Sequence, residues 1–371
     1  NKNNGLYNFD PATGGLIKAA PNTPVNSTFT STYTKVPVLE ASAVGLPLRT
    51  LHFADKNNFA PRIGFAWRPR NSSTFVLRGG WGKFTDILGE GLYEQLAQGG
   101  FLNRGSPGWD NLRLDSRTNV IPDAAFRFPY PFPVPTQAET PAGLSAQGFN
   151  PRLFNPYVQQ WNLSLERALW QTTFRASYVG TKSTNMIYTR DINQRRIPNS
   201  DASRPYYANG FSSGINYMEN GGSQIYHGLQ LEARKRLEKG LMFQAGYVFS
   251  KNISDVLDQD DNDAKATSTD ANNRALDRAR VGYHRKHNFT AAAIWELPFG
   301  RGRRLLGSAP AWGDRVVSGW TLDAELFSGS GQWFNPCRVG SNPLTGLTCT
   351  SQTARPDRIG DGNDGPRLTG S

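Results

Sequence analysis

The chain has 371 residues, of which 37% are hydrophobic and 12% aromatic, and it carries a net charge of +11. It contains no run of about 18 apolar residues, which excludes membrane-spanning helices. The basic residues are spread along the chain rather than gathered in one patch, so the positive charge does not predict nucleic-acid binding.

Apolar and polar residues alternate in eight segments along the chain. In the first, residues 59–67, Phe65 and Trp67 point to one side while Arg62 and Gly64 point to the other. Alternation with a period of two is the pattern of a β-strand. The other segments are residues 74–86, 157–167, the stretch that follows a turn at 169–171, and residues 225–237, 241–250, 287–297 and 320–327. The sequence therefore predicts an all-β fold of antiparallel strands.

Short and long connections alternate between these segments. Three pairs are joined by short turns, and the last pair by a bounded segment at 298–319, whereas residues 87–155, 183–222 and 251–285 are long and rich in Pro, Gly, Asn and Asp. Short periplasmic turns and long extracellular loops are typical of an antiparallel transmembrane β-barrel. A soluble sandwich has no reason to sort its loops by end. We therefore predict a barrel in the bacterial outer membrane.

Aromatic residues lie near both ends of the apolar faces of these strands. Side chains with amphipathic rings settle at the boundary of a bilayer. The alternative is that the rings pack the core of a soluble β protein. The loop pattern favours two membrane girdles, formed by Trp67, Trp295 and Trp320 at the periplasmic end and by Trp81, Tyr178 and Tyr247 toward the extracellular end.

The opposite face of the strands carries charges of both signs. Such charges need water or one another, and the wide lumen of a large barrel supplies both. In a sandwich the same face would be the solvent side. We predict that the lumen wall includes Arg62, Arg78, Glu166, Arg175, Glu232, Arg234, Glu296, Asp323 and Glu325.

The two cysteines, Cys337 and Cys349, lie twelve positions apart in a stretch rich in Gly, Pro and Ser. We predict that they form a local disulfide in an oxidising compartment. With no histidine nearby, two thiolates are too few ligands for a closed zinc site.

Residues 251–279 form an acidic loop. Its carboxylates are dense enough to hold Ca²⁺, although the spacing does not follow the EF-hand pattern. The other interpretation is a solvated loop neutralised by neighbouring arginines. The candidate calcium ligands are Asp258, Asp260, Asp261 and Asp263, and no other cofactor is expected.

No constellation of catalytic residues supports an enzyme. Residues 210–214 fit the pattern G-x-S-x-G, but they lie in a loop and lack the strand and helix that a nucleophile elbow requires. The pattern H-E-x-x-H and the Walker motif are both missing from the sequence.

Several strand motifs together resemble the barrel of Oar-like TonB-dependent receptors, over nearly the whole chain. They are NFDPATG at 8–14, NFAPRIGFA at 58–66, VLRGGWGKF at 76–84, NPYVQQWN at 155–162, ASYVGTK at 176–182, YHGLQ at 226–230, YVFSK at 247–251, RKHNF at 285–289 and LPFGRG at 297–302.

This resemblance implies a 22-stranded barrel that is plugged by an N-terminal domain and energised by TonB. We expect residues 1–371 to be a partial barrel, without the plug, the TonB box or the terminal strands. The implied function is uptake of an unidentified extracellular ligand. The implied partners are outer-membrane lipid and lipopolysaccharide, and the TonB complex through a plug that is not in this chain. The second interpretation is a structural or adhesive surface protein that uses the barrel as an anchor.

Overall fold

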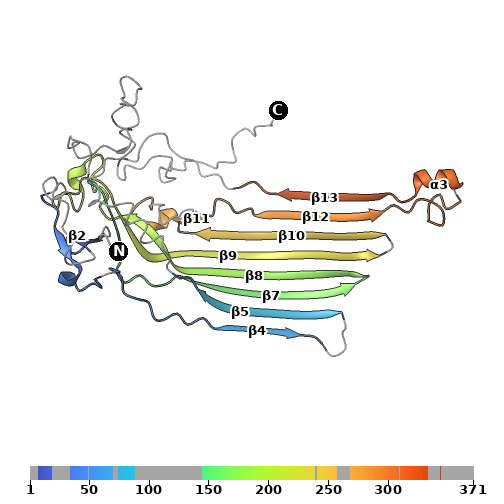
Figure 1. Ribbon diagram of the computed structural model, residues 1–371, viewed down its shortest axis with the longest axis horizontal. Helices are drawn as coiled ribbons and strands as arrows, with labels where there is room; N and C mark the ends of the chain where they lie inside the picture. Colours follow the sequence, from blue (N-terminus) through green and yellow to red (C-terminus); the bar gives the residue numbers. More distant parts are fainter. Residues whose placement is uncertain are drawn as a thin grey trace, which may run out of the picture.

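The computed structural model describes residues 7–18, 34–48, 50–69, 74–87, 144–238, 240–256, 268–308, 310–332 and Pro343. Long strands dominate these residues, and the helices between them are short (Figure 1). Among the described residues, no helix has both the length and the apolar character needed to cross a bilayer.

Eight long strands form an antiparallel meander in which each strand pairs with the next along the chain (Figure 1). These are the eight strands that the sequence predicts, so the all-β antiparallel fold is confirmed. The described sheet is open, with the first and the last of these strands at its edges. In chain order they are β4 (Arg62–Trp67), β5 (Phe75–Thr85), β7 (Tyr157–Leu169), β8 (Thr172–Asp191), β9 (Ile215–Glu238), β10 (Leu241–Ser254), β12 (His287–Glu296) and β13 (Thr321–Gly329).

The short connections gather at one end of the sheet (Figure 1). The β7–β8 turn has two central residues, Trp170 and Gln171, with φ of 46° and 64°. Positive φ at both positions is the geometry of a type I′ hairpin, whose twist matches that of the strands. The connection between β12 and β13 contains one short helix, α3 (Ala311–Val317), which the sequence pattern does not predict.

Two strands exceed their expected length by far. The sequence predicts a loop over residues 183–222, but β8 continues to Asp191 and β9 begins at Ile215, so that prediction is wrong. Asn185 adopts φ of 57° at a register shift after Thr184, which interrupts the alternation that marks a strand. A tilted strand needs about 9–11 residues to cross a bilayer. With 20 and 24 residues, β8 and β9 extend well beyond that length.

A small folded unit, here termed the cap, packs on these extensions at the end opposite the short turns (Figure 1). It comprises residues 7–18, 34–48, 50–53, 144–154 and 187–220. Its strands are β1 (Tyr7–Asp10), β2 (Gly15–Lys18), β3 (Val38–Glu40) and β6 (Ala146–Phe149). The first three form a separate sheet, while β6 pairs in parallel with the start of β9.

The buried apolar core of the described residues lies mainly in the cap. One cluster is centred on Phe9, Phe211 and Ile215, and a second contains Phe149 and Met218. All five side chains are fully buried. Such burial drives folding even though the participating segments are far apart in sequence.

Two buried asparagine side chains also stabilise the cap through hydrogen bonds to the backbone. The Asn8 side chain donates to Phe149 O at 2.9 Å and accepts from Phe149 N at 2.8 Å, as a strand partner would. Asn193 Nδ2 donates to the carbonyl oxygens of Phe211 and Ser213 at 3.0 and 2.7 Å, and its Oδ1 accepts from Tyr206 N at 2.8 Å. These side chains provide partners for backbone groups that no sheet ladder reaches.

Candidate functional site

The candidate functional surface is the long sheet, whose two faces differ sharply in chemistry. Strand register decides which side chains share a face, because directly paired residues point the same way. Glu166 pairs with Arg175, and Arg175 pairs with Glu232. Tracing the register across all eight strands places the nine charged residues expected in the lumen wall on one face, the polar face. That this face lines a lumen stays a prediction.

A chain of ion pairs crosses the polar face over four strands. Glu166 Oε2 lies 3.2 Å from Arg78 Nη1 and 2.9 Å from Arg175 Nη2, and the other arm of Arg175 reaches Glu232 Oε2 at 3.4 Å. The four side chains are partly exposed, so each pair contributes about 1 kcal/mol or less to stability. Beside them lies a depression of about 320 Å³ that Arg234 and Arg236 also line. The polar face can therefore bind charged groups from water.

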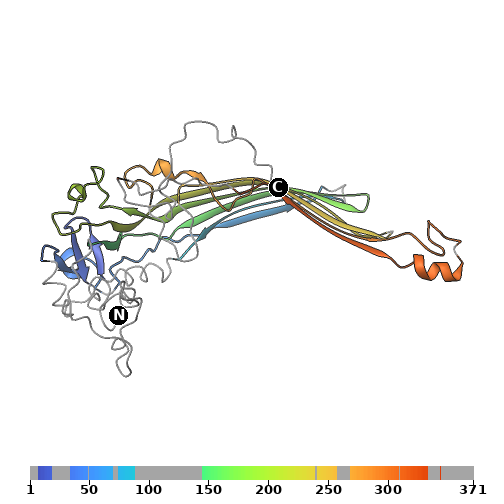
Figure 2. The same cartoon turned by 90° about the horizontal axis from the view of Figure 1, so that it is seen from above.

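The other face, here termed the apolar face, exposes large hydrophobic side chains. Leu163 of β7 is 48% exposed and Leu231 of β9 is 42% exposed, although each of these strands is paired with a neighbour on both sides. A soluble protein rarely exposes a continuous apolar surface of this kind. In Figure 2, α3 lies beyond the end of the strands, and no α-helix of the described residues covers the long sheet.

Five of the six aromatic residues expected in the girdles lie within strands, on the apolar face. Trp67 and Trp295 are near the short turns, whereas Trp81, Tyr178 and Tyr247 are farther along the strands. Trp320 directly precedes β13, and its indole N–H donates to Val316 O of α3 at 2.8 Å. Their contact with a bilayer stays a prediction.

Two tyrosine–histidine pairs repeat along the apolar face. The hydroxyl of Tyr178 lies 2.7 Å from His227 Nδ1, and the hydroxyl of Tyr247 lies 2.7 Å from His287 Nδ1. On the same face the Trp161 indole covers Gly180, where a larger residue would collide with the ring. These pairings depend on register between strands, so the sequence alone does not reveal them.

The remaining candidate residues from the sequence lie either in the cap or outside the described residues. Ser212 of the G-x-S-x-G pattern lies in the cap, where its hydroxyl accepts a hydrogen bond from Leu144 N at 3.2 Å. The candidate calcium ligands Asp258, Asp260, Asp261 and Asp263, and the cysteines Cys337 and Cys349, lie outside the described residues. The calcium site and the disulfide therefore stay predictions.

His284 lies in the loop between β11 (Ala279–Arg280) and β12. Its Nε2 lies 2.9 Å from Ser250 Oγ, and its Nδ1 has no hydrogen-bond partner among the described residues. Burial, followed by the charge of Arg280, lowers the pKa of His284.

The unfolded loop therefore binds a proton before the folded loop does as the pH falls below about 6.5. The folded loop therefore has its full stability above that pH and becomes less stable as the pH falls through the lowered pKa of His284. We expect the protection factors of the amides at residues 281–286, which are exchange rates corrected for the intrinsic effect of pH, to fall between pH 7.5 and pH 5, and the change to disappear in His284→Gln. An unchanged pH response in that variant would contradict this assignment.

Comparisons with known proteins place the chain in a family. The family described as outer membrane beta barrel domain matches residues 1–370. A search of the curated proteins finds no match.

Several solved structures are similar to parts of the chain. The FrpB iron transporter from Neisseria meningitidis is 14% identical with a TM-score of 0.33, covering 66% of this chain and 25% of its own. The siderophore receptor PirA from Pseudomonas aeruginosa is 10% identical with a TM-score of 0.31, covering 64% and 28%. The outer membrane transporter YddB from Escherichia coli is 11% identical with a TM-score of 0.36, covering 73% and 33%.

The matched region thus spans only a quarter to a third of these structures. The family match, in contrast, extends over nearly the whole of this chain. The chain therefore belongs to the outer membrane beta barrel domain family and is a protein of the bacterial outer membrane, as its sequence predicts.

Proposed function

We propose that this chain is the barrel portion of an Oar-like, TonB-dependent receptor that takes up an extracellular ligand. The observation that carries the proposal is the two-faced sheet. One face bears the ion pairs of Glu166 and Arg175, and the other exposes a continuous apolar surface. A sheet with lipid on one side and a water-filled lumen on the other needs one apolar face and one polar face.

The open edges support a barrel larger than the described sheet. Strands β4 and β13 each have one partner in that sheet, which leaves a row of backbone groups on their outer sides. In a bilayer, unpaired edges are too costly to persist, so further strands must complete the ring. A 22-stranded barrel around a plug, as the sequence motifs imply, would supply both the closure and the contact with TonB.

The ends of the strands give the proposed orientation. Short turns are typical of the periplasmic side, which puts the cap and the long connections outside the cell. The polar face then leads from the cap toward the periplasm. A ligand would be recognised at the cap end and would pass along charged residues such as Arg78 and Arg175.

Uptake in cells tests this proposal. The full-length protein is produced in otherwise identical strains with and without TonB, and both are given labelled ferric siderophores, oligosaccharides and peptides. We expect one probe to accumulate only where TonB is present, because the plug opens only with that energy. A protonophore should abolish the accumulation in the same way.

The matched control is surface binding of the same probes at 4 °C, which should not depend on TonB. Binding without TonB-dependent accumulation of any probe would overturn the transport proposal. That result would instead support the anchor interpretation, in which the barrel only displays the cap.

A further inference from the structure

The depression of about 320 Å³ on the polar face lies near the short turns and contains more positive than negative charge. Its two carboxylates, Glu166 and Glu232, already have cationic partners. Arg78 and Arg175 share Glu166, and Arg175 also reaches Glu232. Two cations therefore balance two anions in this chain of ion pairs, and none of these four charges is left for a solute.

The surplus positive charge belongs to Arg234 and Arg236 of β9. Both side chains are exposed, and neither forms an ion pair within the part of the chain that the structure describes. They lie two positions apart on one strand, so their Cα atoms are about 7 Å apart and their side chains share the polar face. Thr173 pairs directly with Arg234, and Gln171 of the β7–β8 turn also lines the depression. Two guanidinium groups are thus accompanied by a neutral hydroxyl and an amide.

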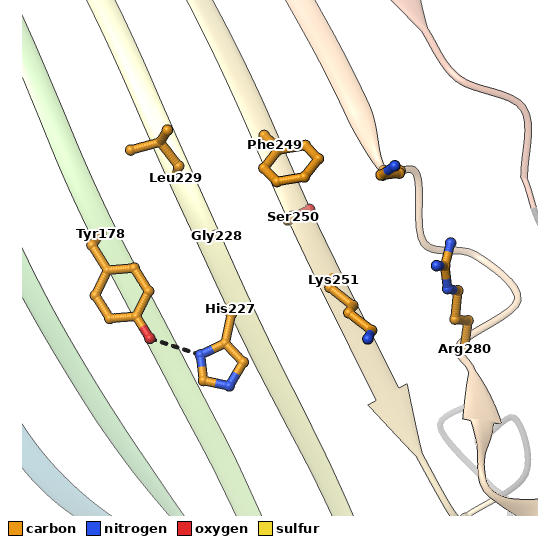
Figure 3. Close-up of a pocket in the computed structure, with 9 residues that line it drawn as sticks. Tyr178, His227, Gly228, Leu229, Phe249, Ser250, Lys251 and Arg280 are labelled. Carbon is orange, nitrogen blue, oxygen red and sulfur yellow. Dashed lines mark hydrogen bonds between the residues drawn. The ribbon is translucent and has the colours of Figure 1, made fainter.

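The apolar face has a depression of different chemistry, of about 410 Å³ (Figure 3). Figure 3 shows Leu229 and Phe249 along it, and the hydroxyl of Tyr178 directed at His227, 2.7 Å from its Nδ1. Under the proposed orientation that face meets lipid. A solute that travels through water would therefore reach only the depression on the polar face.

We propose that the polar depression is an exit site, which binds a small solute carrying at least two oxyanion groups, carboxylate or phosphate, on Arg234 and Arg236. A planar guanidinium group binds such a group through two parallel N–H donors. The volume of the depression is also within the range of small-molecule sites, about 300–1,000 Å³.

The inference rests on the proposed function, in which the polar face lines a water-filled lumen and the short turns are periplasmic. It goes further in two respects. It places a second binding site at the periplasmic end of the lumen, far from the cap, and it assigns a negative charge to the solute that passes there.

Anion binding by the full-length protein in detergent, measured by isothermal titration calorimetry, tests the site. The probes are tricarballylate, which carries carboxylates, and fructose 1,6-bisphosphate, and the uncharged triamide of tricarballylate is the comparison. We expect Arg234→Ala and Arg236→Ala each to weaken anion binding about tenfold, because each removes one charge-assisted pair. Arg234→Lys keeps the charge but loses the planar fork, so it should weaken binding only about threefold.

Lys235→Ala is the matched control. Lys235 lies between the two arginines in the sequence, but it pairs with Phe243 on the apolar face, so the loss of its charge should leave anion binding unchanged. Failure of both anionic probes to bind, or an equal loss in the control, would overturn the site. Equal binding of the triamide would overturn the role of charge. The tighter of the two anionic probes assigns the bound group as carboxylate or phosphate.

The double variant Arg234→Ala/Arg236→Ala separates this inference from the proposed transport. In cells it should slow TonB-dependent uptake and leave surface binding at 4 °C unchanged, because recognition at the cap end is intact. Full TonB-dependent uptake by the double variant would remove the exit site alone. Absence of TonB-dependent uptake in the unmodified protein, with anion binding that still requires both arginines, would remove the transport proposal alone.

Discussion

Replacing Phe9 by alanine is expected to lower the free energy of opening the cap by about 3–5 kcal/mol, the usual range for a buried aromatic residue. Phe9 is 0% exposed. Its ring makes edge contacts with Tyr206 and Phe211, at centroid distances of 5.0 and 5.3 Å. Truncation removes both contacts and leaves a cavity that the surrounding strands cannot fill. Native-state hydrogen exchange of the amides in β1 and β2 measures the effect.

The loss should stay within the cap. Amides in β10 and β12 lie in the long sheet and should keep their protection, because local opening involves separate cooperative units. Phe59→Ala is the matched control, since Phe59 is 77% exposed and its loss should change stability by less than about 0.5 kcal/mol. Equal destabilisation by both variants, or loss of protection in β10, would contradict the expected result.

Replacing Asn193 by alanine is expected to destabilise the cap by about 3 kcal/mol. The Asn193 side chain is 0% exposed and is the hydrogen-bond partner of three backbone groups, at Tyr206, Phe211 and Ser213. Alanine leaves all three groups without that partner, including the buried carbonyl of Phe211, which costs more than the net value of a single hydrogen bond. Faster exchange of the Tyr206 amide, with faster proteolysis of residues 192–214, would report the change.

Asn209→Ala provides the control in the same loop. Within the described part of the chain, Asn209 makes one long side-chain hydrogen bond, to Thr13 O at 3.5 Å, in an exposed position. Its replacement should therefore have little effect on exchange or proteolysis. If Asn193→Ala behaved like Asn209→Ala, the amide of Asn193 would have no structural role.

The long strands are predictable from the sequence because alternation has a direct physical cause. Successive residues of a strand point to opposite faces, so a sheet with unlike faces imposes a period of two. This pattern identifies Phe65, Phe174 and Ala293 with the apolar face, and Arg175 and Glu325 with the polar face. The members of the polar face are thus predictable. Their ion pairs are not, because pairing depends on register.

The cap is not predictable in the same way. Its strands have only three or four residues, too few for a period to appear. Its decisive contacts join distant segments, as Asn8 and Phe149 do across 141 positions. Buried asparagines also look like loop residues in the sequence, because Asn is common in turns. Only the folded chain distinguishes Asn193 from Asn209.

The packed cap has a thermodynamic consequence for the ligand binding proposed above. Long loops usually lose conformational entropy when they bind, and that loss reduces affinity. Here Arg204 and Asn193 already hold residues 192–214 against the core, with Arg204 Nη1 donating to Asn193 O at 2.6 Å. Association at this surface should therefore show a small entropic penalty and a heat-capacity change that reflects contact area alone. Under the proposed orientation, the cap would be a receptor surface that is already ordered before its ligand arrives.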